Sequence, residues 1–233
     1  MADSDHVQPE ALLRLQSWLS PSFPSGAYSY SHGLEWAVEA GEVEDRLSLV
    51  DWLAADIRYG TGRNDAIFFS EAWRLTAGND RRGLLEVARL AAAFRGTAEL
   101  SLEASQQGRA CLATLSQVWP GQVMTWVKNA LREGRVEPTA AVILGSCTAE
   151  HAIPLVFAVT SYLLSYAANL ISAGVRLVPL GQTEGQRAIA ELEGTILAVG
   201  TAPNTIDELG SAAFMIDHAS MKHETQYTRL FRS

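Results

Sequence analysis

The feature that most constrains this chain is its stretch of residues 152–175, which contains no Asp, Glu, Lys or Arg. An uncharged apolar stretch of about 20 residues is long enough to cross a bilayer as a helix. Polar groups are expensive in hydrocarbon, and the basic clusters that flank many membrane spans are missing here. We therefore predict a buried central helix; a membrane span is the alternative, which solubility of the purified chain would test. Proline and polar residues interrupt the stretch at Pro154, Thr160, Ser161, Ser165, Asn169 and Ser172.

Helical periodicity extends over most of the remaining chain. Apolar residues recur at spacings of three and four, as in Leu34, Ala37 and Val38, and Gly or Pro ends the repeats, as Gly41 does here. Residues 175–178 and 195–199 are by composition also suited to short strands. The pattern predicts an all-α fold, a single helical domain of roughly ten helices over residues 1–233 with a C-terminal tail. Residues 1–8 and about 219–233 are expected to be flexible.

Composition narrows the class of partner. Of the 233 residues, 48% are hydrophobic, which supports a sizeable core. The formal net charge is -8 and Lys128 and Lys222 are the only lysines, whereas phosphate backbones attract clustered cations, so we expect no nucleic-acid partner. The two cysteines, Cys111 and Cys147, provide no disulfide framework, and the acidic start is unlike a signal peptide, so we expect a cytoplasmic location.

The common catalytic and nucleotide-binding motifs are absent from the sequence. A P-loop needs Gly-x-x-x-x-Gly-Lys followed by Ser or Thr, and neither lysine lies in that context. Cys147 and His151 are spaced by four on one helix face, but no third metal ligand accompanies them. No nucleophile stands beside a recognisable base. We expect no enzyme activity, no cofactor and no metal; a helical enzyme with an unrecognised acid/base site, or a metal-storage protein, is the alternative.

The segment of residues 20–35 has an unusual loop before a predicted helix. Pro24 fixes its own backbone φ and Gly26 permits a tight turn, so a stiff loop delivers Tyr28 to the helix start. Ser29 or Ser31, His32 and Gly33 follow it, and Glu35 falls in the first turn, where the helix dipole favours a carboxylate. Two interpretations stay open: a structural corner whose tyrosines fill the core, or a preorganised contact surface.

The last segment, residues 223–233, is rich in aromatic and arginine side chains, the types that dominate binding hot spots. Tyr227, Leu230 and Phe231 are spaced so that a helix would place them on one apolar face, with Arg229 and Arg232 in its last turn. Such a segment can dock on its own core or on a partner, and the sequence does not separate the two.

Together with a third segment, residues 174–182, these two segments resemble the family of urease accessory proteins UreF, in the family's order along the chain. The resemblance covers residues 12–233; many relatives have Lys where this chain has Arg176. It implies a helical, non-enzymatic scaffold that dimerises and assists assembly of the nickel centre of urease. It further implies a UreD-like (UreH-like) partner, a UreG-like GTPase that the scaffold regulates, and apo-urease. In this family the C-terminal region is implicated in the UreD contact.

The resemblance and the end segments together mark candidate partner-binding residues. They are Pro24, Gly26, Tyr28, Ser29, His32, Gly33, Glu35, Arg176, Pro179, Gly181, Gln182, His223, Glu224, Tyr227, Arg229, Leu230, Phe231 and Arg232. We expect no catalytic residue, no metal ligand and no membrane contact.

Overall fold

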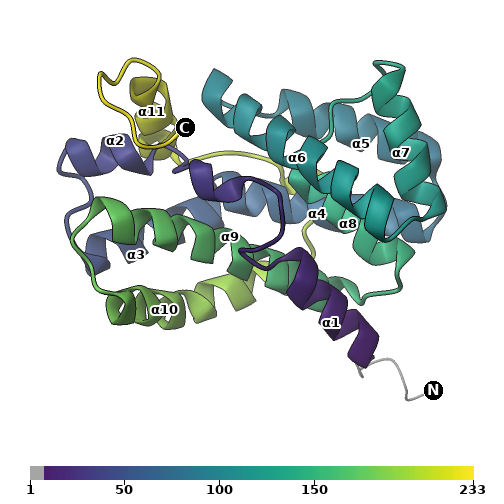
Figure 1. Cartoon of the computed structure of the whole chain (residues 1–233), viewed down its shortest axis with the longest axis horizontal. Coiled ribbons are helices and arrows are strands. Elements are labelled where there is room, and N and C mark those ends of the chain that lie inside the picture. Colours follow the sequence, from purple (N-terminus) through teal and green to yellow (C-terminus); the bar gives the residue numbers. More distant parts are fainter. Residues whose placement is uncertain (1–7) are drawn as a thin grey trace.

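The computed structural model describes residues 8–233, which are predominantly helical and contain no strand (Figure 1). The α-helices are α1 (Pro9–Trp18), α2 (Leu34–Glu39), α3 (Arg46–Tyr59), α4 (Thr61–Ala77), α5 (Arg81–Ala93), α6 (Ala98–Val118), α7 (Gln122–Arg132), α8 (Ala140–Glu150), α9 (Leu155–Leu177), α10 (Gln182–Gly200) and α11 (Phe214–His223). Two short 3-10 helices, η1 (Ala27–Ser29) and η2 (Ile206–Glu208), lie in connections. The predicted all-α class is confirmed.

The stretches that also suited strands are helical. Residues 175–177 end α9, and residues 195–199 lie inside α10. In α10 the buried residues Leu192, Thr195 and Ile196 follow the helical spacing of three and four, so one face packs inward and the other stays in solvent.

Several helices begin where a short polar side chain caps the free backbone donors. Asp45 accepts from the Ser48 N–H before α3, and the Ser48 hydroxyl in turn accepts from the Asp45 N–H. Asp80 accepts from the Gly83 N–H before α5, and the Thr97 hydroxyl accepts from the Leu100 N–H before α6. These caps fix the starts of the helices and so set which residues face inward.

The centre of the core is the contact between α4 and α8. Residues 140–148 of α8 are all buried, because helices cover it on every side. A Cβ on Gly145 would lie 2.3 Å from the Phe69 carbonyl oxygen in α4, so only glycine allows this close approach.

Helix α9 contains nearly all of the uncharged stretch for which a buried central helix was predicted, and one face of it is buried. It is long and apolar enough to span a membrane by length and composition, and 39% of its most apolar window is buried inside the protein. The buried face, which includes Leu163 and Leu170, packs into the core, while Phe157 and Leu164 remain 45% and 43% exposed.

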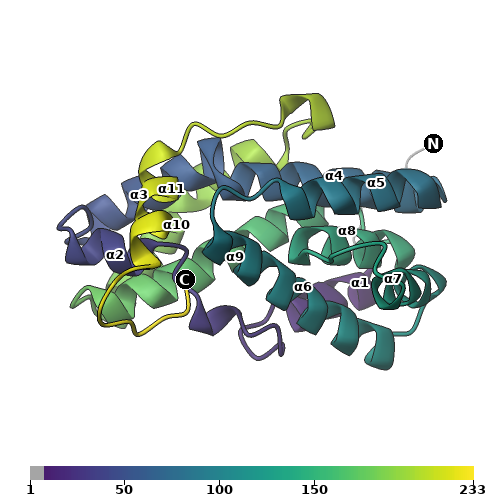
Figure 2. The same ribbon diagram turned by 90° about the horizontal axis from the view of Figure 1, so that it is seen from above.

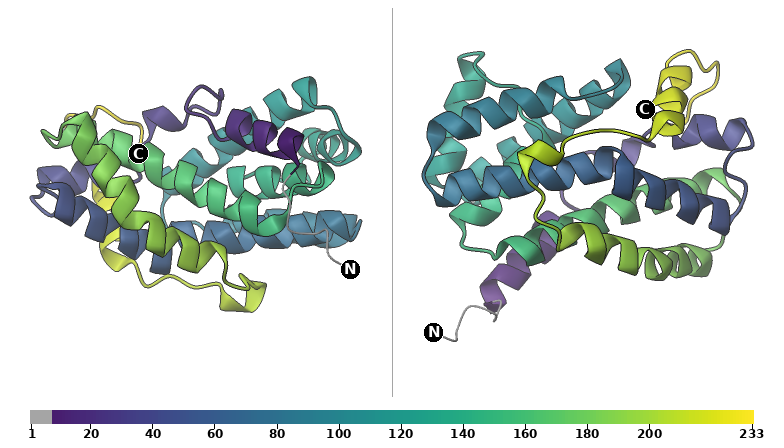
Figure 3. Two further views of the ribbon diagram at one scale, coloured as in Figure 1. Left: turned by 90° about the horizontal axis from the view of Figure 1, so that it is seen from below. Right: turned by 180° about the vertical axis from the view of Figure 1, so that it is seen from behind.

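The helices are distributed over two ends of an elongated molecule (Figure 1). Helices α5, α6 and α7 form one end, and α2, α3 and α11 lie toward the other. The connection from α10 to α11 crosses the outer face of α4 (Figure 3), where Arg63 donates to the Glu208 carbonyl oxygen and Arg74 to that of Asn204. This long crossing returns the C-terminal residues to the N-terminal loop.

Candidate functional site

The sequence segments that carry the candidate residues converge at one place in the fold. The loop of residues 19–33, the C-terminal end of α9 and residues 224–233 lie together beside α6 (Figure 2). We call residues 224–233 the tail. Three buried glutamates hold the tail or the helix end that leads into it, and we call Glu35, Glu99 and Glu103 the acceptor glutamates.

Glu35, in the first turn of α2, binds the backbone of the tail. Its Oε1 accepts from the Leu230 N–H at 2.6 Å, and its Oε2 accepts from the Phe231 N–H at 2.9 Å. Gly33 has a φ of 78° and lies so close to α11 that a Cβ would be 2.8 Å from the Ser220 backbone nitrogen. Glycine at this position therefore serves both the turn and the packing of α11 onto α2.

His223 ends α11 and is completely buried between two acceptor glutamates. Its Nδ1 lies 2.7 Å from Glu99 Oε2, and its Nε2 lies 3.2 Å from Glu35 Oε2. Arg229 of the tail donates to the other oxygen of Glu99 at 2.7 Å, so Glu99 contacts both the end of α11 and the tail.

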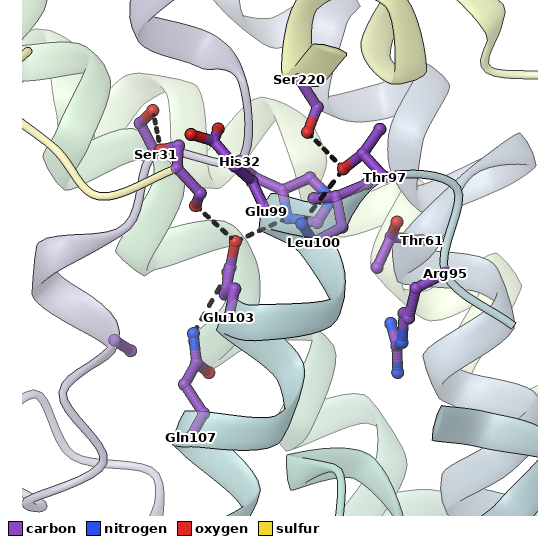
Figure 4. A network of polar contacts seen from close by, with 12 residues as sticks. Ser31, His32, Thr61, Arg95, Thr97, Glu99, Leu100, Glu103, Gln107 and Ser220 are labelled. Atoms are coloured by element: carbon purple, nitrogen blue, oxygen red, sulfur yellow. Dashed lines mark hydrogen bonds and ion pairs between the residues drawn. The ribbon is translucent and has the colours of Figure 1, made fainter. Parts of the chain in front are cut away.

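Glu103, one turn along α6 from Glu99, joins the end of the tail to the N-terminal loop (Figure 4). Its Oε2 accepts from the Ser233 hydroxyl at 2.8 Å and lies 3.3 Å from His32 Nδ1. Burial disfavours the charged imidazole, but Glu103, with Asp56 and Asp65, outweighs it and raises the pKa of His32 to about 9. Burial also disfavours the Glu103 carboxylate, but its contacts with His32 and Ser233 hold its pKa below the usual value.

A second polar layer lies deeper in the protein. Asp56 accepts from the Tyr166 hydroxyl at 2.6 Å, and burial raises the pKa of this carboxyl. Asp65 accepts from Arg95 and from the Tyr162 hydroxyl, each at 2.8 Å. Both carboxylates have donors, and Asp65 has a cation beside it, so this layer satisfies its own buried polar groups. None of these residues was marked from the sequence.

Two polar side chains of α9 bind the N-terminal loop, which explains why Ser165 and Asn169 interrupt the apolar stretch. Ser165 donates to the Leu19 carbonyl oxygen, and Asn169 donates to that of Ala27. Arg176 donates to the Tyr28 carbonyl oxygen at 3.0 Å, and its guanidinium lies 4.4 Å from the centre of the Phe231 ring. Arg176 therefore contacts both the loop and the tail.

A cavity of about 210 Å³ lies beneath this loop. Phe23, Cys111 and Leu144 form part of its apolar wall, and Glu103 and Asn169 contribute polar atoms. Beside the cavity, hydrogen bonds from α9 hold the first part of the loop, while Tyr30 and His32 bind its last part to α6.

The candidate residues divide by burial. The buried ones are His32, Gly33, Glu35, His223 and Phe231. Gly26 and Ser29 are half-buried; the exposed ones are Pro24, Tyr28, Arg176, Pro179, Gly181, Gln182, Glu224, Tyr227, Arg229, Leu230 and Arg232. A buried side chain cannot touch a partner while the tail is in place, so the buried residues are suited to positioning and the exposed ones to contact.

The tail is not a helix, which corrects the predicted apolar face of Tyr227, Leu230 and Phe231. Helix α11 ends at His223, and Glu35 takes the backbone donors of Leu230 and Phe231 that a helical turn would use. Phe231 is 4% exposed and packs into the core, whereas Tyr227 is fully exposed and Leu230 is 66% exposed. The segment docks on its own chain, one of the two alternatives that the sequence left open.

The N-terminal loop combines the two interpretations left open for it. Tyr30 is buried and its hydroxyl donates to Gln106, whereas Tyr28 is 70% exposed. The third segment, residues 174–182, contacts the loop and the tail through Arg176. Among residues 8–233, no hydrogen bond connects Pro179, Gly181 or Gln182 with the tail.

The sulfur and histidine groups farther along the chain do not gather into a metal site. Within residues 8–233, no group of three or more His, Cys, Asp or Glu side chains has a metal-binding arrangement. Cys111 and Cys147 are both buried, and burial raises the pKa of the Cys111 thiol to about 12. His151 instead binds Arg14 through its Nδ1 at 3.1 Å.

Comparison with known proteins gives a consistent result. The model of the UreF family matches residues 43–193 of this chain. Several relatives are described as "Urease accessory protein UreF". One from Rhodopseudomonas palustris strain TIE-1 is 47% identical over 228 residues, covering 97% of this chain and 94% of that protein. One from Xanthobacter autotrophicus is 46% identical over 234 residues, covering 100% and 95%, and one from Bradyrhizobium diazoefficiens is 44% identical over 225 residues, covering 96% and 92%.

Proposed function

Because the chain belongs to the UreF family of urease accessory proteins, we propose that it is a scaffold for nickel insertion into apo-urease. In this proposal it bridges a UreD-like (UreH-like) protein and a UreG-like GTPase, and it regulates the GTP hydrolysis that accompanies insertion. The chain itself supplies no catalytic group and acts in the cytoplasm. Its contribution is to hold partner proteins in a productive arrangement.

The observation that carries the proposal is the surface around the tail. Tyr28, Tyr227 and Leu230 are large side chains that the fold leaves in solvent, and hydrogen bonds hold the backbone of Tyr28 and Leu230. Rigid aromatic anchors bind partners at a low entropic cost, because little backbone freedom is lost on association. Arg176, which contacts both the loop and the tail, adds a cation to this surface. We assign this surface to the UreD-like partner.

Point substitutions in the tail test the assignment better than deletion. Removing the tail together with the end of α11 would take away His223 and Phe231, both buried, and leave the acceptor glutamates without partners. Truncating Tyr227 and Leu230 together to alanine removes exposed groups only. Each hot-spot anchor is worth roughly 2–4 kcal/mol, so capture of the UreD-like partner should fall sharply.

The matched control is the double alanine variant of Phe214 and Met215, two exposed apolar residues at the opposite end of α11. It should retain partner capture, and both variants should keep the parental melting curve. Equal capture of the partner by all three proteins would remove the tail from the proposed contact surface.

We also propose that the chain forms a homodimer through the exposed face of α9. Phe157, Leu164 and Ala168 lie along this uncharged face at helical spacing. Two copies of a chain with a net charge of -8 repel each other over most of their surface, so an uncharged apolar face is the favoured place for contact. A standard interface buries about 800 Å² per partner, and two-fold symmetry would present two copies of the tail surface.

A further inference from the structure

The end of the molecule formed by α5, α6 and α7 carries a cluster of arginines, although the chain as a whole has a net charge of -8. An open groove of about 610 Å³ lies there. Arg89, Arg109 and Arg135 line it, and its floor includes Ala92, Leu131 and Val136. We call it the arginine groove. None of its residues belongs to the tail surface or to the candidates marked from the sequence.

The arginines of this groove outnumber the carboxylates beside them. Arg109 binds Glu137 through two nitrogens, and Arg135 binds Glu133 with its Nε at 2.6 Å. Arg89 is exposed, and its Nε donates to the Arg135 carbonyl oxygen at 2.8 Å, a neutral acceptor that leaves the charge unbalanced.

Arg132 extends the positive surface, and Arg81 shares a tryptophan with the groove residue Arg135. Arg132 is exposed in the last turn of α7, next to the groove residue Leu131, and has no ion pair among residues 8–233. The guanidinium groups of Arg81 and Arg135 lie 5.6 Å and 5.9 Å from the ring centre of Trp126. Such stacking orders arginine side chains before any partner arrives, and arginine with tryptophan is a combination typical of binding hot spots.

We propose that the arginine groove docks an acidic segment of a partner protein. Carboxylates suit guanidinium groups because the two planar groups can form paired hydrogen bonds, and Glu137 already binds Arg109 in this way. The apolar floor accommodates the aliphatic part of a peptide, and a groove admits an extended segment. The positive charge of this end, in a chain that is acidic overall, would also orient an acidic partner as it approaches.

A nucleic acid fits the groove less well. Glu137 lines the groove and Glu133 lies beside it, and both would repel a phosphate backbone. Lys128 is the only lysine in α7, and the remainder of the chain is strongly acidic. A long polyanion that extended beyond the groove would therefore meet repulsion.

The test measures binding of a fluorescein-labelled peptide of twelve glutamates to the full chain by fluorescence anisotropy, at low and at moderate salt. The variant carries Arg89→Gln and Arg132→Gln. The control carries Arg63→Gln and Arg187→Gln, which remove the same charge from α4 and α10, outside the groove. We expect binding that weakens with salt, a loss of about tenfold in the groove variant and less than about twofold in the control.

The melting temperatures of the parent chain, the groove variant and the control, measured by circular dichroism, must agree, so that a change in binding does not reflect unfolding. Equal weakening in both variants, or absence of binding at low salt, would overturn the proposal. Equal or tighter binding of a twelve-nucleotide oligothymidylate would overturn it in favour of a nucleic-acid site. Light scattering that shows self-association lost only in the groove variant would overturn it in favour of a contact between copies.

Discussion

The substitution Glu35→Gln should detach the tail while leaving the helical body folded. The carboxylate accepts from the N–H groups of Leu230 and Phe231 and lies 3.2 Å from His223 Nε2. Glutamine retains one acceptor oxygen and places an NH2 donor where the other oxygen was, so at least one buried donor loses its acceptor. A hydrogen bond to a charged group is worth about 1.5–3 kcal/mol and an unsatisfied buried donor costs about 1–3 kcal/mol, so we expect a loss of about 3–5 kcal/mol.

Hydrogen exchange measured by mass spectrometry reports this loss where it occurs. Amide protection in the tail should fall by roughly 150- to 4000-fold, the equivalent of that free energy, while protection in α4 and α8 stays near the parental value. If the tail unfolds together with the body, the melting temperature should instead fall by roughly 6 °C or more. The matched control is Glu39→Gln, the same change at the exposed C-terminal end of α2, where the Glu39 side chain accepts from Gln226 of the tail and from no other side chain of residues 8–233.

The reasoning fails if Glu35→Gln and Glu39→Gln behave alike. Melting temperatures within about 1 °C of each other, together with parental exchange in the tail, would mean that the buried carboxylate does not hold it.

Other predictions address the core, the buried ion pair and the proposed dimer. Gly145→Ala should cost at least about 1–3 kcal/mol in a denaturant titration because the new methyl group meets α4, whereas Gly194→Ala, which has open space, should gain about 0.5–1 kcal/mol. The pKa of His32 is raised from 6.5 to about 9, so its contribution to stability is complete below pH 6.5 and is lost as the pH rises through 9. His32→Gln should flatten this part of the pH–stability curve; an unchanged slope would refute the charge assignment. Leu164→Glu should give a monomer by light scattering, and a persistent dimer would move the interface away from the outer face of α9.

The sequence predicted the parts of this fold that depend on local spacing. Helical periodicity and the glycine after α2 are visible in a few neighbouring residues, so the all-α class follows from them. Glu99 and Glu103 could not be identified in this way, because they occupy ordinary positions in α6 and acquire a role only from residues far along the chain. The connection from α10 to α11, which crosses α4 and brings these residues together, shows no repeated apolar spacing in the sequence.

The tail shows how a tertiary contact can override local spacing. The positions of Tyr227, Leu230 and Phe231 suit a helix, but a helix needs its own backbone donors, and the Glu35 carboxylate takes two of them. The three side chains therefore separate into one core residue and two exposed residues. Arg176 was marked through its segment, but its simultaneous contact with loop and tail depends on the packing of both against α9.

Because both cysteines are buried, we expect the chain to react very slowly with thiol reagents. Only the thiolate reacts, and with the pKa of Cys111 at about 12 hardly any thiolate forms near neutral pH. Burial raises the pKa of Cys147 as well. A cysteine introduced at an exposed position such as Tyr227 or Leu230 would therefore be the site of selective labelling with a spin or fluorescent probe, without removal of the native thiols. The slow rate at which Cys111 and Cys147 are modified would then report how often the core opens in the same sample.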